Sequence, residues 1–258
     1  MTRHLRYNAN IGRQKPENIV NRQAACPFCE RDKLVDILAE APPLVLLKNK
    51  YPVLEDAYQT VIIETEDCDA EFSEYAPEHL HRVVRFGLEH WQRMIRSGEF
   101  ESVLFFKNHG PHSGGTIRHP HSQIVGLHHL DYRAGVEPHH FEGIPIDRRD
   151  GIEFNVSTLP RMGFTEFNVV LSDWSQVDQL ADYVQIAAHY VLNHFHARCN
   201  SYNLFFYEHG EGVAAKLIPR FVVSPLFVGF AIPQVSSRVD EIAQTVRDRY
   251  LEPASEPR

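Results

Sequence analysis

The sequence predicts an α+β fold of two similar halves, each an antiparallel sheet with one helix. Apolar residues recur at steps of three and four over Glu78–Arg96 and again over Val177–Ala197, the spacing that lines one face of a helix. Short β-rich runs bounded by turn residues flank each helical stretch. Because the order of strands, helix and strands recurs, the chain is expected to be a degenerate internal duplication.

In the first half, the predicted helix begins near Pro77, which suits the first turn of a helix. A glycine-bearing polar loop is expected at Asn108–Arg118, immediately before the last strand of this half. The predicted strands are Leu44–Leu47, Val61–Glu64, Ser102–Lys107 and Ser122–Leu127.

In the second half, Asp131–Asp150 is interpreted as the connection between the halves, because it contains the turn-forming residues Pro138, Gly143 and Pro145. The predicted strands are Glu153–Val156, Phe167–Leu171, Tyr202–Tyr207 and Ala214–Val223. We expect an N-terminal half at 1–135 and a divergent C-terminal half at 150–250. The proline- and glutamate-containing tail, 251–258, is expected to be disordered.

Composition narrows the class of protein. The 258 residues are 43% hydrophobic and 23% charged, which is ordinary for a folded globular chain. The formal net charge of −8 disfavours a nucleic-acid-binding surface. No stretch approaches about 18 consecutive apolar residues, and the first residues lack a secretory core, so the expected location is the cytoplasm, with no membrane partner.

The segment His119-Pro120-His121-Ser122-Gln123 carries the main chemical signal. On a strand beginning near His121, alternate residues share a face, so His119, His121 and Gln123 are expected to address one pocket. An unprotonated imidazole there could attack an α-phosphorus and hold a nucleotidyl group as a phosphoramidate. The alternative is that the alternating histidines are only a half-buried polar face.

The loop before this segment supplies donors for phosphate oxygens. Gly114 and Gly115 permit close approach of the main chain, Thr116 offers a hydroxyl, and Arg118 offers a charged guanidinium. Together with Gln123 they are candidates for contact with an anionic substrate.

Several ordered motifs resemble one family. The stretch Lys107–Gln123 resembles the E-N-x-G…G-x-S-x-x-H-P-H-x-Q region of galactose-1-phosphate uridylyltransferases and ADP-glucose phosphorylases, a branch of the histidine-triad (HIT) superfamily. Cys26-Pro-Phe-Cys29, Asn49–Pro52 and Glu64–Asp69 resemble that family's C-P-F-C, N-K-F-P and E-T-P-x-H-x segments. The second half matches less, keeping Tyr202-Asn203 and Pro219-Arg220. The resemblance implies a HIT-like fold.

The resemblance also implies roles for individual residues. His121 corresponds to the nucleotidylated histidine and Gln123 to the glutamine that steadies the phosphoryl group. Asn49 and Asn108 correspond to positions near the bound nucleotide, and Thr116 to a loop serine that contacts phosphate. Since HIT hydrolases usually carry a third histidine where this chain has Gln123, the transferase or phosphorylase branch is favoured.

A structural zinc is also implied. In the family it is commonly held by both cysteines of C-P-F-C, a histidine before the first helix, and the first histidine of H-P-H; here those positions are Cys26, Cys29, Cys68 and His119. A Cys3His set suits tetrahedral zinc. The alternative is coincidental spacing, with Cys68 acting as a small buried hydrophobe. The family's second metal site is expected to be absent, because Gly212–Lys216 stands in its place.

The motifs and the family resemblance indicate three candidate functions. The first is a nucleotidyltransferase or phosphorylase that acts by ping-pong on a nucleoside diphosphate sugar or similar phosphoanhydride. The second is a dinucleoside polyphosphate hydrolase, in which water resolves the intermediate. The third is a nucleotide-binding or regulatory protein that has lost catalysis. A nucleotide or nucleotide sugar is the expected partner in each case, and the resemblance makes a homodimer plausible.

Overall fold

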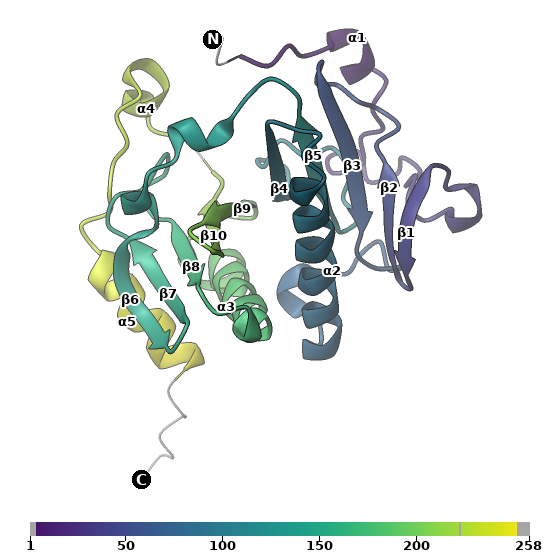
Figure 1. Cartoon of the computed structure of the whole chain (residues 1–258). Coiled ribbons are helices and arrows are strands. Elements are labelled where there is room, and N and C mark those ends of the chain that lie inside the picture. Colours follow the sequence, from purple (N-terminus) through teal and green to yellow (C-terminus); the bar gives the residue numbers. More distant parts are fainter. Residues whose placement is uncertain (1–3, 222, 252–258) are drawn as a thin grey trace. The chain divides into compact units, whose positions relative to one another are not determined.

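The computed structural model describes residues 4–221 and 223–251, and the chain divides into two compact units at 1–136 and 137–258 (Figure 1). A short helix, α1 (Ala9–Gly12), precedes the first sheet. The tail expected at 251–258 lies, from residue 252 onward, outside the described residues. Among the residues described, no helix combines the length and apolar character needed to cross a membrane.

The first unit is a five-stranded antiparallel sheet in the order β1-β2-β3-β5-β4. Its strands are β1 (Ile37–Ala41), β2 (Leu44–Lys48), β3 (Ala57–Ile63), β4 (Ser102–His109) and β5 (His121–Leu127). The expected strands are present, and β1 is an additional one.

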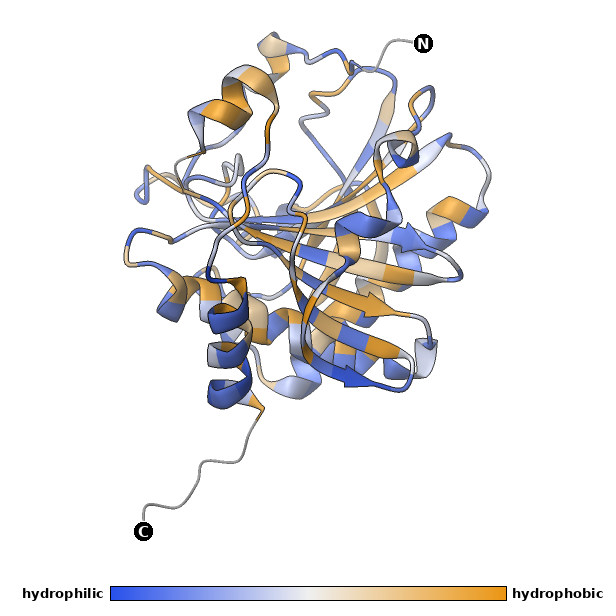
Figure 2. Ribbon diagram, turned by 90° about the vertical axis from the view of Figure 1, so that its left-hand side faces the viewer, coloured by the Kyte–Doolittle hydropathy of each residue, from blue (hydrophilic) through white to orange (hydrophobic). Residues whose placement is uncertain are grey.

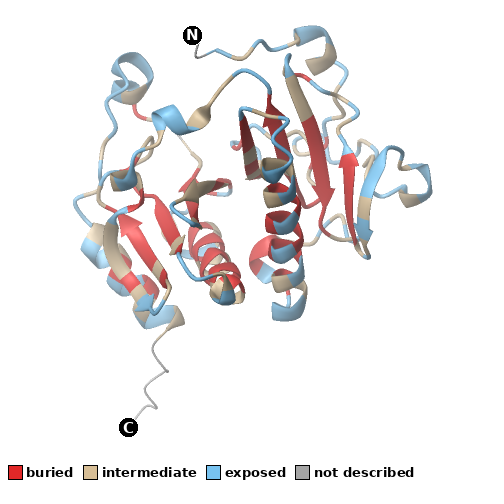
Figure 3. Ribbon diagram, viewed as in Figure 1, coloured by how far each residue is buried: buried red, intermediate tan, exposed pale blue. Residues whose placement is uncertain are grey.

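Helix α2 (Pro77–Arg96) covers one face of this sheet and contacts β4 and β5 (Figure 1). The helix face predicted from the spacing of apolar residues is buried from Leu80 to Trp91 (Figure 3). The Trp91 indole donates a hydrogen bond to the carbonyl of Val103 (2.9 Å) and its ring packs beside Phe105. Burial of this apolar face supplies most of the helix's stability.

The opposite face of the sheet carries the HPHSQ strand. Phe105 pairs with Ile124 across the β4–β5 ladder, so Ile124 faces α2, whereas His121 and Gln123 point the other way. On that second face the cluster of Val45, Leu47 and Ile63 is covered by Phe28 and Leu34 of the N-terminal segment. Residues before β1 therefore shield the face from which His121 projects.

The second unit repeats this topology. Its antiparallel sheet has the order β6-β7-β8-β10-β9, with strands β6 (Gly143–Arg149), β7 (Ile152–Ser157), β8 (Phe167–Leu171), β9 (Tyr202–His209) and β10 (Gly212–Pro219). Helix α3 (Val177–Tyr190) follows the third strand, as α2 does in the first unit. The predicted α+β fold of two similar halves, each with an antiparallel sheet and a helix after its third strand, is confirmed.

Three expectations for the second half need correction. Asp131–Asp150 is not only a connection, because β6 occupies its last part and pairs with β7. The strand expected at Ala214–Val223 ends at Pro219, whose ring removes a main-chain donor. The helix expected at Val177–Ala197 changes after Tyr190 to a π-helical turn, Val191–Phe195.

Two further helices follow β10. Helix α4 (Pro225–Phe230) exposes apolar side chains, among them Val228 and Phe230 (Figure 2). Helix α5 (Val239–Tyr250) buries Ala243 and Val246 and contacts β6 and β7. Its Arg247 donates to the carbonyls of Ile146 and Pro145 (3.0 and 2.6 Å), which attaches the helix to β6.

We predict that Gly126→Ala destabilises the protein. A Cβ at Gly126, in β5, would lie 2.5 Å from ring atoms of Phe100, so the ring or the strand must shift. We expect the free energy of unfolding in urea to fall by about 1–3 kcal/mol. The matched control is Gly135→Ala, where an added Cβ meets nothing within 4 Å; its effect should stay within about 0.5 kcal/mol. Equal stability of the two variants would contradict the predicted contact.

Candidate active site

His121 is the first residue of β5 and is almost fully buried, with 7% of its surface exposed. Its Nδ1 lies 2.8 Å from the main-chain oxygen of His119. A carbonyl oxygen can only accept, so Nδ1 carries the hydrogen and donates it. The lone pair of the neutral ring therefore lies on Nε2, the nitrogen that is free to accept a proton or to attack an electrophile.

The surroundings of His121 keep the ring neutral. Burial lowers its pKa to about 4, the hydrogen bond to His119 opposes this shift, and the positive charge of Lys107 adds to it. The ring of Phe28 packs edge-on against His121, with 5.5 Å between centroids. A neutral imidazole in an apolar setting at ordinary pH meets the first requirement for nucleophilic attack.

His119 belongs to a different group of side chains. It is fully buried, and its Nε2 donates to the carbonyl of Thr65 (2.8 Å), which leaves the lone pair on Nδ1. That Nδ1 lies 3.6 Å from the sulfur atoms of both Cys26 and Cys29. The expectation that His119 shares a pocket with His121 and Gln123 therefore needs correction, because His119 precedes the strand and its ring turns toward the thiols.

The donor atoms of Cys26, Cys29, Cys68 and His119 all lie within 4.8 Å of one another, so this cluster could hold a metal ion. Tetrahedral ligands with bonds of about 2.0 to 2.3 Å stand about 3.6 Å apart, which is the separation of His119 from two of the sulfurs. A second hydrogen bond that fixes the tautomer of a ligating histidine, as Thr65 provides here, is a regular feature of such sites.

The thiols interact strongly. Burial raises the pKa of Cys26, but hydrogen bonds from His119, from the Phe28 amide and from Cys29 bring it down to about 6. Burial and the neighbouring sulfurs raise the pKa of Cys68 to about 12. Several thiolates so close together repel one another, and a bound cation would offset that repulsion.

Gln123 lies two residues beyond His121 on the same face of β5, where it pairs with Val61 and Phe106. Asn49 follows β2, and its side-chain oxygen accepts a hydrogen bond from the Tyr51 amide (2.8 Å). Asn108 lies near the end of β4. These three predicted residues come from β5, from β4 beside it, and from the end of β2, which β3 separates from β5.

The loop between β4 and β5 has the conformation that its glycines predict. Gly114 has a φ of +83°, a left-handed conformation that favours glycine. A Cβ at Gly115 would lie 3.2 Å from Asn108 Cβ, so the loop approaches that asparagine closely. The carbonyl of Thr116 accepts from the amides of Asn18 and Ile19 (2.9 and 3.2 Å), which ties the loop to the N-terminal segment.

Arg118 makes contacts that the sequence did not predict. Its amide donates to the side chain of Asn18 (2.7 Å). Its guanidinium forms an ion pair with Asp69 and lies 3.8 Å from the sulfur of Cys68. The charge of Arg118 therefore lies beside the cysteine cluster as well as beside the HPHSQ segment.

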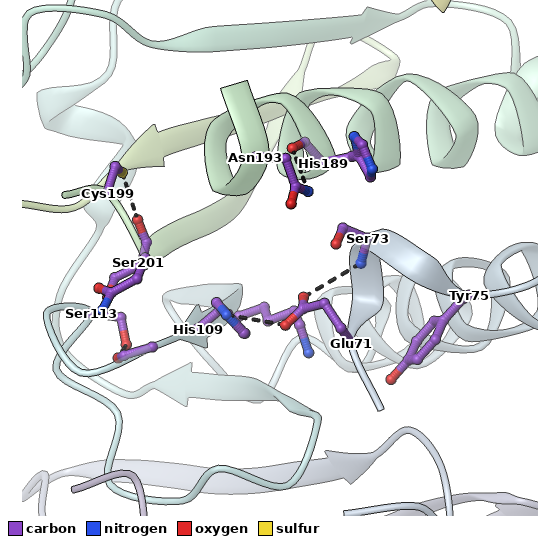
Figure 4. A network of polar contacts seen from close by, with 12 residues as sticks. Glu71, Ser73, Tyr75, His109, Ser113, His189, Asn193, Cys199 and Ser201 are labelled. Carbon is purple, nitrogen blue, oxygen red and sulfur yellow. Dashed lines mark hydrogen bonds and ion pairs between the residues drawn. The ribbon is translucent and has the colours of Figure 1, made fainter. Parts of the chain in front are cut away.

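A polar cluster behind β5 was not predicted from the sequence. Glu64 and Lys107, both almost fully buried, form an ion pair of 2.8 Å. Farther along β4, His109 pairs with Glu71 (3.1 Å), whose carboxylate also accepts from the Ser73 amide (Figure 4). Burial raises the pKa of Glu71 and lowers that of His109 to about 4. Lys107 and Glu64 lie within the motifs that resemble the uridylyltransferase family. A charged residue inside a β-rich segment is the sequence feature that could have indicated this buried ion pair.

A cavity of about 320 Å³ lies in the second unit. Its lining includes Phe141, Arg148, Glu153 and His209. Glu153 neutralises Arg148 through two contacts of 2.6 and 2.5 Å, so the cavity offers no unpaired arginine to a phosphate. None of the residues predicted from the sequence as site residues lines it.

Comparison with known proteins places the chain in a family. The N-terminal domain model of DUF4931, a domain of unknown function, matches residues 7–130, and the C-terminal domain model matches 133–251. A crystal structure of a DUF4931 family protein from Bacillus cereus is 43% identical, with a TM-score of 0.77, and the match covers 84% of this chain and 100% of the other. The chain belongs to the DUF4931 family.

Relatives outside DUF4931 confirm the resemblance stated from the motifs. A curated galactose-1-phosphate uridylyltransferase of Streptomyces lividans is 30% identical over 108 residues, which span 38% of this chain but only 28% of that protein. An ADP-glucose phosphorylase from Arabidopsis thaliana, solved with bound ADP-glucose, has a TM-score of 0.70 at 14% identity and covers 98% of this chain and 100% of its own. At that identity the likeness shows a shared fold.

We predict that the cysteine cluster binds one metal ion per chain. Elemental analysis of protein purified without added metal should find a stoichiometric ion, and Cys26→Ser should abolish it by removing one of four ligands. Cys199→Ser is the control, because Cys199 is a buried thiol outside the cluster, donating to the Ser201 carbonyl (Figure 4). Wild-type protein without stoichiometric metal would refute the site.

Proposed function

We propose that this chain is a nucleotidyltransferase or phosphorylase that acts on a nucleoside diphosphate sugar or similar phosphoanhydride through a nucleotidyl-His121 intermediate. The observation that carries the proposal is the hydrogen bond from His121 Nδ1 to the His119 carbonyl, which leaves the lone pair on Nε2. The names of the relatives and the shared fold support the class of substrate.

The reaction proceeds in two displacements. Nε2 of His121 attacks the α-phosphorus, an Nε2–P bond forms, and the P–O bond to the leaving phosphate breaks with its electron pair on that oxygen. The ring becomes positively charged, while Nδ1–H keeps its hydrogen bond to the His119 carbonyl. An oxygen of the acceptor, phosphate or a sugar phosphate, then attacks phosphorus, and the Nε2–P bond breaks to restore the neutral ring.

The neighbouring residues would bind the phosphoryl oxygens and the nucleotide. Gln123 shares a face of β5 with His121 and would donate its amide hydrogens to a phosphoryl oxygen. In this proposal 1–135 is the catalytic half and 150–250 is the divergent half. The further substrate contacts proposed are Asn49, Asn108, Gly114, Gly115, Thr116 and Arg118.

The metal proposed for the cysteine cluster is zinc, because three thiolates and one imidazole form a closed tetrahedral donor set. Held by Cys26, Cys29, Cys68 and His119, the ion would cross-link the N-terminal segment to the residue two positions before the nucleophile and would contribute structure rather than chemistry. His119 and the nucleophile thus have separate tasks although they are two residues apart.

The decisive experiment is intact-protein mass spectrometry after incubation with UDP-glucose, ADP-glucose or a diadenosine polyphosphate. Wild type should gain a nucleotidyl adduct, and His121→Gly should gain none, because the attacking nitrogen is removed. His129→Gly removes an exposed histidine from the loop after β5 and should keep the adduct.

Each other outcome has a definite meaning. Turnover of a dinucleoside polyphosphate without any added acceptor would replace the transferase by a hydrolase. Bound nucleotide without adduct or turnover would leave a nucleotide-binding or regulatory protein. An adduct that persists in His121→Gly would place the nucleophile elsewhere.

A further inference from the structure

We propose that the buried ion pair of Lys107 and Glu64 positions the nucleophile by fixing the main chain of residues 119–121. This inference rests on the proposed role of His121. Neither residue would touch the substrate in this role. They would act through the three peptide groups that set the direction of the His121 ring.

Three consecutive carbonyls at the start of β5 each have a donor. The His119 carbonyl accepts from His121 Nδ1 (2.8 Å), the Pro120 carbonyl from the Glu64 amide (3.1 Å), and the His121 carbonyl from Lys107 Nζ (3.3 Å). Glu64 therefore acts twice, through its amide on Pro120 and through its carboxylate on Lys107. The ion pair joins two of the three donors into one unit.

The pair is almost completely buried, so it has little contact with solvent. Lys107 is 3% exposed and Glu64 is 1% exposed. Besides Lys107, the Glu64 carboxylate accepts from the Tyr75 hydroxyl (3.1 Å), and the ammonium also lies 5.5 Å from the centre of the Phe72 ring. A buried ion pair is weak support for stability, because desolvation offsets the attraction between the charges. A role in geometry explains its presence better than a role in stability.

The second unit supplies a contrast. Lys216 and Glu166 form an equally buried ion pair of 2.7 Å. There the carboxylate accepts from the amides of Arg161, Met162 and Gly163, so the pair orders a loop. Lys216 lies on β10, which begins at Gly212 rather than at a histidine. The two pairs share burial and chemistry, but only the first holds the main chain of a candidate nucleophile.

Loss of the first pair should therefore slow chemistry more than binding. If residues 119–121 shift, His121 Nδ1 no longer stays on the His119 carbonyl, and the lone pair no longer stays on a correctly aimed Nε2. Misplacement of a reacting group by about 1 Å can cost about a hundredfold in rate. Because the pair lies behind β5, on the side that faces α2, contacts of the substrate on the His121 face should remain.

The test uses the double variant Lys107→Met/Glu64→Gln, which removes both charges and leaves neither uncompensated. In the presence of excess nucleotide sugar, its single-turnover rate of adduct formation should fall about 10- to 100-fold, with nucleotide affinity within about twofold of wild type. Lys216→Met/Glu166→Gln is the matched control and should keep the rate. Unfolding in urea monitors stability in both variants.

A spectroscopic readout separates this inference from the proposed function. Nitrogen-15 NMR of labelled imidazole should show one tautomer of His121 in wild type, with hydrogen on Nδ1, and a mixture in the Lys107/Glu64 variant. An unchanged rate, or equal losses in both double variants, would overturn positioning. If wild type forms no adduct at all, the proposed function fails, and the tautomer alone decides: a single tautomer in the variant overturns positioning, and a mixture supports it.

Discussion

The hydrogen bond between the His121 ring and the carbonyl of His119 is the constraint on which the candidate site depends. It assigns the hydrogen to Nδ1 and the lone pair to Nε2, and it does so with two residues of the same short segment. This hydrogen bond orients the His121 ring only if the main chain between His119 and His121 is itself fixed in position. The surrounding structure supplies that restraint from both sides of the sheet.

On the face that bears His121, the N-terminal segment provides the restraint. Cys26 and Cys29 lie beside the His119 ring, Phe28 packs against both histidines, and Asn18 binds the loop that precedes them. On the other face, Glu64 and Lys107 bind the next two carbonyls. Contacts within one half of the chain thus account for the position of the ring.

The two halves illustrate how a duplicated topology can take on different tasks. Both contain five antiparallel strands in the same order, with a helix after the third strand. The last strand in sequence begins with His121 in the first unit and with Gly212 in the second. A glycine cannot supply a nucleophile. The chemistry proposed for His121 therefore has no counterpart at the first residue of the equivalent strand in the second half.

The pattern of residues along the chain was enough to predict the elements that depend on periodicity and to indicate the candidate site residues. The apolar faces of α2 and α3, the strands around them and the HPHSQ segment are local patterns, because each arises from neighbours along the chain. The sequence did not predict β1, β6 or α5. Their sequences are short or polar, and packing against other elements decides that they form strands or a helix.

The family resemblance implied different roles for His119 and His121, and the tertiary structure shows where each ring points. Alternation along a strand predicted a shared pocket, but His119 lies before the strand and its ring turns toward the thiols of Cys26 and Cys29, 93 and 90 residues away in the sequence. The same holds for Lys107, whose partners Glu64 and His121 lie on other strands or at their ends. Spacing along a chain fixes which side chains share a face, whereas hydrogen bonds between distant segments fix where each ring points.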